Sequence, residues 1–307
     1  MGTDRQSRGH RAAVGFAASV KYGLFGSHLL GDALMQTPAI RALRSLRPDA
    51  QIEYYHSVDR PGAAMLEGNP HLDRLEVLSV WPRGPREYPL SRFTSGDAVY
   101  PLDALRAYRW GERHGKTLAE GFGHALGVTV TDLRYDYAMT DAERARGRAL
   151  ADTYGGGRPV VVVARHSASC HSNAGDGTPA NKCVANRHWY EISVWLARQG
   201  FRPLAIGSPD DARDERYAQW EGMRAYDLPI RQVAALLAAS HAVLSVDTGI
   251  RHLAAAVGAN LYCISGAIPL SLIRCVPVRK GQRIHEVAIA VSDVDARVLI
   301  DGASNIL

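Results

Sequence analysis

Residues 155–164 read GGGRPVVVVA and place a strand directly after a glycine-rich break in the chain. Valine is branched at Cβ and favours extended backbone, so four valines in succession predict a strand. The run shows no alternation of apolar and polar side chains, which indicates burial on both faces, as in the centre of a parallel sheet. The glycines and the proline before it predict a hinge, so we expect a domain to begin at residue 156.

Short apolar runs and helical stretches alternate on both sides of this break. After it, strands are predicted at residues 203–206, 242–246 and 261–264, with helices at 188–199, 211–221, 230–240 and 249–257. Before it, apolar runs at 13–20, 51–56 and 75–80 predict strands, and helical periodicity covers 33–46, 102–126 and 141–154. The proline-containing stretch 81–100 predicts a loop.

This alternation predicts an α/β protein made of two doubly wound, Rossmann-like domains. We expect residues 1–155 to form the first domain and residues 156–307 the second, with the last helix free to pack back on the first domain. Ligands bind beyond the carboxyl ends of the strands in such sheets, so the two domains are expected to face each other across a cleft.

The composition excludes several classes of protein. The 307 residues are 46% hydrophobic, which is too apolar for a long disordered chain. No apolar run approaches the roughly 20 residues of a membrane-spanning helix. Four cysteines fit a reducing compartment, and we expect a cytoplasmic protein. The net charge of +5 is modest, and no basic stripe interleaved with aromatic residues predicts binding to nucleic acid.

A glycine-rich segment, GLFGSHLLGD at residues 23–32, leads into the first predicted helix. Glycines such as Gly26 and Gly31 let backbone amides and a helix N-terminus approach a ligand closely. Their spacing does not fit the dinucleotide-binding fingerprint. Asp32 has two interpretations: a cap of the helix, or a general base that faces the cleft and accepts a proton from a hydroxyl.

A second turn of the same kind occurs at residues 247–258, which read DTGIRHLAAAVG after a predicted strand. The amides of Thr248 and Gly249 would lie at a helix N-terminus, where phosphate groups bind favourably. The alternative is that Asp247 caps an ordinary alanine-rich helix.

Two motifs in this order, GDALMQTPAIRAL at residues 31–43 and the second turn at residues 247–258, resemble those of glycosyltransferase family 9. This family contains the ADP-heptose:lipopolysaccharide heptosyltransferases. The resemblance implies a GT-B fold, a nucleotide-sugar donor held mainly by the second domain, and inverting transfer that requires no metal or other cofactor. It also implies that Asp32 is the catalytic base. Asp247, Thr248, Gly249 and His252 match the motif whose turn lies against the donor phosphates.

Three further residues match the family less closely. A basic residue before a tryptophan contacts the diphosphate in the family; Arg187 fits this place, and Lys182 is the alternative. Asp211 is the choice for an acidic residue that binds the ribose hydroxyls, although a surface turn explains it equally well. The loops at residues 165–179 and 265–269 depart from the family pattern, so the sugar or base of the donor can differ from ADP-heptose.

Two histidines and two cysteines suggest a metal set, with the members His166, Cys170, Cys183 and His188. Structural zinc sites use tighter pairs of cysteines, so we favour side chains that line a donor loop and expect no metal.

The sequence therefore predicts a glycosyltransferase whose partners are a nucleotide-sugar donor and an acceptor hydroxyl. The acceptor is either lipopolysaccharide core, which would bring the enzyme into peripheral contact with the inner face of the cytoplasmic membrane, or a small natural-product intermediate. A monomer is expected. The alternatives are a nucleotide-sugar epimerase of similar fold and a non-catalytic protein that binds nucleotide sugars.

Overall fold

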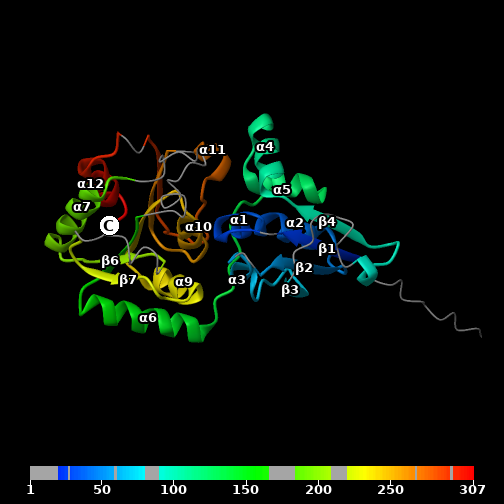
Figure 1. Cartoon of the computed structure of the whole chain (residues 1–307), viewed down its shortest axis with the longest axis horizontal. Helices are drawn as coiled ribbons and strands as arrows, with labels where there is room; N and C mark the ends of the chain where they lie inside the picture. Colours follow the sequence, from blue (N-terminus) through cyan, green and yellow to red (C-terminus); the bar gives the residue numbers. More distant parts are fainter. Residues whose placement is uncertain are drawn as a thin grey trace, which may run out of the picture.

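The computed structural model describes residues 20–26, 28–58, 61–79, 90–165, 184–208, 220–266, 268–290 and 293–307. They form two lobes that lie side by side, each built around a parallel sheet with helices packed on it (Figure 1). The predicted α/β architecture of two Rossmann-like units is the one observed.

The first lobe contains a four-stranded sheet with the order β3-β2-β1-β4. The chain leaves β1 toward β2 and later returns to pair β4 on the other side of β1. The strands are β1 (Lys21–Gly26), β2 (Gln51–Ser57), β3 (Arg74–Leu78) and β4 (Ala98–Leu102). The helices are α1 (Leu30–Met35), α2 (Thr37–Leu46), α3 (Ala63–Leu66), the 3-10 turn η2 (Leu90–Arg92), α4 (Ala104–His114) and α5 (Leu118–Leu126).

The second lobe contains a six-stranded sheet with the order β10-β9-β8-β5-β6-β7. The strands are β5 (Val160–Ala164), β6 (Arg202–Ile206), β7 (Met223–Ala225), β8 (Ala242–Val246), β9 (Leu261–Ser265) and β10 (Ile284–Ala288). The helices are α6 (Asp141–Gly155), α7 (Asn186–Arg198), α9 (Ile230–Ala239), α10 (Gly249–Ala256), α11 (Leu270–Ile273) and α12 (Ala296–Ser304). All five residues of β5 are buried, as the run of valines predicts.

The first strand lies later than predicted. β1 covers Lys21–Gly26, whereas we expected residues 13–20, of which 13–19 lie outside the described residues. Glycines hid this strand, because they lower the apparent tendency of a sequence to form one. Packing requires both: a Cβ on Gly23 would meet the ring of Phe93, and a Cβ on Gly26 would meet the hydroxyl of Tyr54.

Other predicted elements are divided or were missed. The helix expected at 33–46 is two helices that separate at Gln36, and Pro38 lies in the first turn of the second, where its missing N–H costs nothing. The helix expected at 102–126 is α4 and α5. β4 begins inside the stretch predicted to be a loop, and β7 and β10 were not predicted. The helix expected at 211–221 falls mostly outside the described residues.

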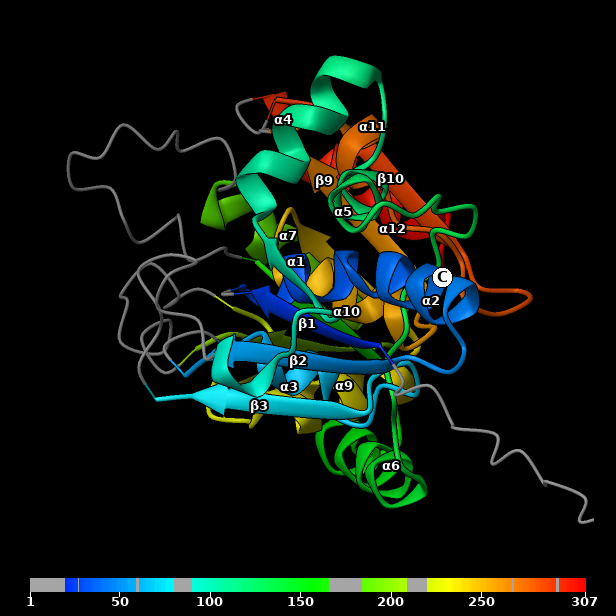
Figure 2. The ribbon, with the colours of Figure 1, turned by 90° about the vertical axis from the view of Figure 1, so that its right-hand side faces the viewer.

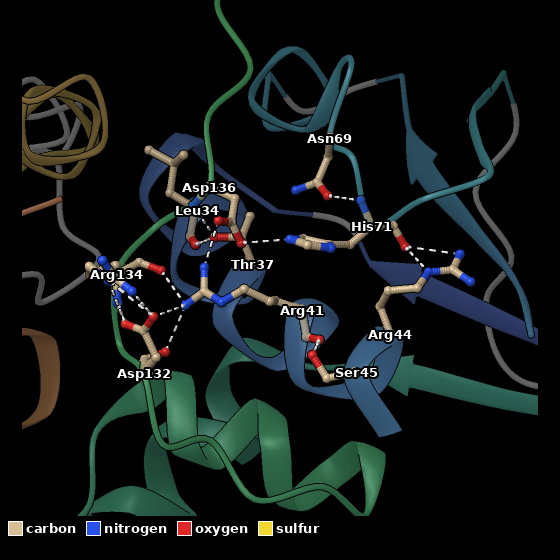
Figure 3. Close-up of polar contacts among 10 residues, drawn as sticks. All are labelled: Leu34, Thr37, Arg41, Arg44, Ser45, Asn69, His71, Asp132, Arg134 and Asp136. Atoms are coloured by element: carbon tan, nitrogen blue, oxygen red, sulfur yellow. Dashed lines mark hydrogen bonds and ion pairs between the residues drawn. The ribbon is translucent and has the colours of Figure 1, made fainter. Parts of the chain in front are cut away.

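The chain crosses between the lobes along residues 128–140, an irregular part of the described chain. Arg41 of α2 holds this crossing in place (Figure 3). Its guanidinium donates to the backbone oxygens of Asp132 and Arg134, both at 2.9 Å, and to the carboxylate of Asp136 at 2.5 Å. Arg41 belongs to the first family motif, and its observed contacts attach the crossing to α2.

Two helices clarify how the second lobe is assembled. α6 packs along α9, where Gly147 lies so close to Ala235 that a Cβ would collide with its carbonyl oxygen (Figure 1). The last helix does not pack back on the first lobe: α12 lies against α7 in the second lobe, and Gly302 leaves room for the ring of Tyr262. The predicted boundary at residue 155 coincides with the end of α6, whereas the crossing between the lobes lies earlier, at residues 128–140, and α6 packs on α9. In the described part of the chain, every helix is too short or too polar to cross a membrane.

Candidate active site

The cleft between the lobes contains a cavity of about 850 Å³. Its wall in the second lobe includes the carboxyl ends of β5, β6 and β8, through Ala164, Ile206 and Asp247. Its wall in the first lobe includes Leu29, which follows β1, and Ala104, which follows β4. In each sheet the strand order reverses at the strands that border the cavity, between β1 and β4 in the first lobe and between β5 and β8 in the second. Ligands usually bind at this place in open α/β sheets.

Two glycines allow the helices α1 and α10 to meet beside this cavity. Both views of the molecule show these helices next to each other between the lobes (Figures 1 and 2). A Cβ on Gly249 would lie 2.8 Å from the Cβ of Leu30 and 3.1 Å from the backbone nitrogen of Gly31. A Cβ on Gly31 would lie 3.0 Å from the ring of His252. Side chains at these positions would force the two helix N-termini apart.

Asp32 lies in the first turn of α1, is half-buried and lines the cavity. The N-cap of α1 is Leu29, so Asp32 is not the cap that its position suggested as an alternative. Its backbone oxygen accepts from the backbone N–H of Gln36 at 3.2 Å, and the side-chain oxygen of Gln36 accepts from the hydroxyl of Tyr54 at 2.8 Å. Gln36 and Tyr54 are fully buried, so they fix the turn from which Asp32 projects.

The second turn is built around Thr248, which is the N-cap of α10. The backbone N–H of Ile250 donates to the Thr248 hydroxyl oxygen at 3.0 Å. Asp247 is therefore not the cap either. The N-terminus of α10 begins at Gly249, and both Thr248 and Gly249 line the cavity. A helix N-terminus that opens on a cavity favours an anionic group there.

Asp247 is part of a buried charge cluster behind this turn. The guanidinium of Arg251 lies 3.4 Å from the carboxylate of Asp247 and 3.2 Å from that of Glu286 on β10. Arg251 is fully buried and also donates to the backbone oxygen of Ile273. Burial opposes the charge of this guanidinium, but its thiol and carboxylate neighbours together raise the pKa of Arg251 above its usual value. The cluster fixes Asp247 and the start of α10 relative to the sheet.

His252 lines the same cavity and is held by groups from two other segments. The hydroxyl of Tyr135, from the crossing between the lobes, lies 3.1 Å from His252 Nδ1. The thiol sulfur of Cys275 lies 3.6 Å from the same nitrogen. Burial raises the pKa of Tyr135 and of Cys275 well above the usual values, so both are neutral hydrogen-bonding groups near pH 7. These contacts at Nδ1 fix the orientation of the imidazole beside the cavity.

The structure thus brings six of the candidate residues to one cavity: Gly31, Asp32, Asp247, Thr248, Gly249 and His252. Gly26 lies within β1, where it packs against Tyr54. Arg187 is exposed at the start of α7, and its Nε donates to His188 Nε2 at 3.1 Å. It is not among the described residues that line the cavity.

Several candidates lie outside the described residues, namely Lys182, Asp211, His166, Cys170 and Cys183. Of the suggested metal set, only His188 is described, and its Nδ1 lies 3.8 Å from the carboxylate of Glu191. Within the described ranges, no group of three or more His, Cys, Asp or Glu side chains is arranged to hold a metal ion.

Sequence reasoning missed Arg251, Glu286 and Tyr135. Arg251 follows Asp247 by four residues inside the second motif, but arginine is mostly exposed in proteins, so this spacing alone does not indicate burial. Glu286 and Tyr135 gave no local signal, since each reaches the site from a segment distant in the sequence.

Comparisons with known proteins agree with this geometry. The sequence profile of glycosyltransferase family 9 (heptosyltransferase) matches residues 114–284, more than half of the chain. A search of curated proteins finds no match.

Solved structures are similar over nearly the whole chain. The glycosyl transferase family 9 from Veillonella parvula DSM 2008 has a TM-score of 0.72 at 15% identity and covers 94% of this chain and 97% of its own. The ADP-heptose lps heptosyltransferase II of E. coli has a TM-score of 0.68 at 15% identity, with 94% and 98% covered. The E. coli heptosyltransferase WaaC with ADP has a TM-score of 0.63 at 15% identity, with 94% and 100% covered. These similarities show a shared GT-B fold. With the profile match, they confirm that the chain is a glycosyltransferase and belongs to glycosyltransferase family 9.

Proposed function

We propose that this enzyme transfers a sugar, a heptose from ADP-heptose, to an acceptor hydroxyl, with inversion and without a metal. The observation that carries the proposal is that Asp32 and the 247–249 turn line one cavity from opposite lobes. A base and an anion-binding helix N-terminus are the two groups that such a transfer needs on either side of the anomeric carbon.

In this reaction the acceptor oxygen forms a bond to the anomeric carbon while the bond from that carbon to the diphosphate oxygen breaks. The acceptor proton passes to the carboxylate of Asp32. The electron pair of the broken bond leaves with the nucleotide diphosphate. Attack from the face opposite the leaving group inverts the anomeric centre. Asp32 is half-buried and lines the cavity, so its carboxylate is accessible to an acceptor hydroxyl.

The leaving diphosphate would bind at the N-terminus of α10. The amides of Thr248 and Gly249 and the ring of His252 are the groups we assign to it, with Arg187 or Lys182 as the cation. Asp247 supports the turn through its ion pair with Arg251 at 3.4 Å. Asp211 is assigned to the ribose. Donors that point at a developing negative charge in a closed site lower the barrier strongly.

The acceptor is a glycan such as lipopolysaccharide core or a small hydroxyl compound. The cytoplasmic location, any peripheral contact with a membrane and the monomeric state stay predictions that follow from this choice.

Replacing the base tests the proposal directly. Asp32→Asn removes the proton acceptor and keeps the shape of the side chain, so turnover should fall by about 10²–10⁴-fold. The affinity for ADP, measured by calorimetry, should change little. Asp49→Asn serves as a matched control, because Asp49 is exposed in the turn after α2. Near-normal turnover in Asp32→Asn would exclude this residue as the base.

Thermal-shift measurements with ADP, UDP, GDP and dTDP test the donor, and a lack of response to all four would contradict the transferase assignment.

A further inference from the structure

The first-lobe wall of the cavity is apolar. It is formed by α1, the start of α4 and the start of α5, through Leu29, Met35, Leu105, Tyr108 and Leu118. Leu29 is 48% exposed and Leu105 is 56% exposed. A single exposed leucine carries no meaning, but these two line the same cavity as the candidate base, Asp32. The wall therefore presents apolar surface to whatever lies next to Asp32.

The opposite side of the cavity mouth is also apolar. Ile268 and Ile273, before and within α11, line the cavity in the second lobe. α11 approaches α4 across the cleft, as Figure 1 shows. A molecule that enters between these helices is consequently enclosed by aliphatic and aromatic side chains on both sides.

The ionisable side chains that line the cavity also indicate which kind of acceptor it can hold. Ligand pockets in general have apolar walls, so the informative feature is the kind of charge that accompanies them. The ionisable side chains among the described lining residues are Asp32, Asp247, His252 and Tyr108, and neither lysine nor arginine occurs among them. Asp247 lies on the second-lobe side of the cavity and is paired with Arg251. On the first-lobe side, an anionic acceptor would be stripped of water beside the carboxylate of Asp32 with no cation from the described wall, which is unfavourable.

We propose that the acceptor hydroxyl is carried on an uncharged body with an apolar alkyl or aryl part, which packs against Leu105, Tyr108 and Leu29. This inference rests on the proposed function, because it assumes that Asp32 receives the acceptor proton. The apolar part lies on the α4 wall, and the hydroxyl points inward to Asp32 and the anomeric carbon. The acceptor is thus chosen by burial of apolar surface and by exclusion of anions.

Matched glycosides test the class of acceptor, because the two members of each pair differ in a single feature. The affinities of the ADP-saturated enzyme for methyl and octyl β-D-glucoside, kept below the micellar concentration, measure the effect of the apolar part. Phenyl β-D-glucoside and phenyl β-D-glucuronide differ in one carboxylate and measure the effect of charge. We expect octyl glucoside to bind at least 10-fold more tightly than methyl glucoside, and the glucuronide at least 10-fold more weakly than the phenyl glucoside. Affinity that rises steadily from hexyl to decyl glucoside supports a lipid acceptor; affinity that is already maximal with phenyl supports a compact aromatic one.

Two variants locate this binding. Leu105→Glu places a carboxylate on the wall at an exposed position near the start of α4, where an acidic residue is compatible with the helix. It should abolish the preference for octyl glucoside. Leu46→Glu is the control, because Leu46 is 55% exposed at the end of α2 and is not among the lining residues. Equal affinities for methyl and octyl glucoside, tighter binding of the glucuronide, or an equal effect of both variants would overturn the proposal.

The proposed function is checked separately by ADP binding and by hydrolysis of ADP-heptose, in which water replaces the acceptor as the attacking group and ADP is released. Failure of those two measurements would count against the donor and the reaction, whereas failure of the glycoside series with normal ADP binding would count against the apolar acceptor alone.

Discussion

The two strand-to-helix turns that meet at the cavity are held in place by opposite means. Behind the turn at residues 247–252, the charge of Arg251 is buried between Asp247 at 3.4 Å and Glu286 at 3.2 Å. At residues 28–32 the support is neutral: His28 is buried, and its backbone N–H donates to His56 Nε2 at 3.2 Å. The second-lobe turn therefore depends on charges that remain paired, and the first-lobe turn depends on imidazoles that remain uncharged.

This difference in support, charged behind one turn and neutral behind the other, agrees with the function that we assign to each turn. A turn that receives a diphosphate must keep its amides fixed while a large negative charge arrives and departs, and a paired, buried cluster gives that rigidity. A turn that carries a base must leave its carboxylate accessible to the acceptor hydroxyl, and half-buried Asp32 lines the cavity. A buried, paired charge cluster on one side and a half-buried carboxylate on the other divide the two tasks between the lobes.

The largest expected effect comes from breaking the charge cluster. Arg251→Met keeps much of the volume but leaves Asp247 and Glu286 buried without their cation, which should lower the free energy of unfolding by about 3–5 kcal/mol. Urea denaturation measures this loss. Arg297→Met is the control, because the Arg297 side chain is 87% exposed on α12. A loss below about 1 kcal/mol would show that the second-lobe turn does not depend on the cluster.

Low pH should destabilise the first-lobe turn at residues 28–32. Burial, and next the neighbouring His56, lower the pKa of His28 from 6.5 to about 4, although Asp103 and the backbone of Leu102 oppose the shift. The folded protein then binds fewer protons at His28 than the unfolded chain does between pH 6.5 and 4. Stability that is fully present above pH 6.5 is lost as the pH falls, by up to about 3 kcal/mol below pH 4.

The free energy of unfolding, measured from about pH 4 to 7.5, checks this prediction. His28→Gln should flatten the acid side of the profile, whereas His124→Gln, at an exposed position, should leave it unchanged. An identical slope for the native protein and His28→Gln would mean that acid acts elsewhere.

The same two turns show how far the sequence alone leads. The valine run of β5 and the alternation of elements predicted the fold, because buried parallel strands and amphipathic helices leave local patterns. The two motifs pointed to Asp32 and to Thr248 and Gly249, which the structure places on one cavity. β1 was misplaced, because its glycines are required by the distant ring of Phe93 and hydroxyl of Tyr54.

The side chains that support the two turns could not be predicted from local sequence patterns. Arginine is rarely buried, so nothing in residues 247–258 alone indicates that Arg251 is fully enclosed. Its partner Glu286 lies on β10, a strand that was not predicted. The imidazole of His56 reaches His28 from the neighbouring strand β2, a contact that depends on strand order rather than on any spacing in the sequence.

The contact between α1 and α10 can be disrupted by a substitution that changes neither the Arg251 cluster nor the His28–His56 pair. Gly249→Ala would place a Cβ 2.8 Å from the Cβ of Leu30, so α1 must move away from α10. Displacing a base by about 1 Å can reduce turnover by about 10²-fold, and we expect that loss in kcat with a smaller change in ADP affinity. Gly96→Ala is the control, since a Cβ there meets nothing within 4 Å. Unchanged kcat in Gly249→Ala would show that the spacing of the two helices does not matter to the reaction.

The smallest expected effect comes from the crossing between the lobes. Tyr135→Phe removes the hydroxyl that lies 3.1 Å from His252 Nδ1 and leaves the buried ring in place. This contact holds the imidazole in its orientation beside the cavity, so its loss should weaken ADP binding by about 5-fold, the equivalent of about 1 kcal/mol. Calorimetry with ADP measures the change, and Tyr190→Phe, at an exposed position on α7, is the control. If Tyr135→Phe binds ADP as the native protein does, the second-lobe turn orients His252 without help from the crossing.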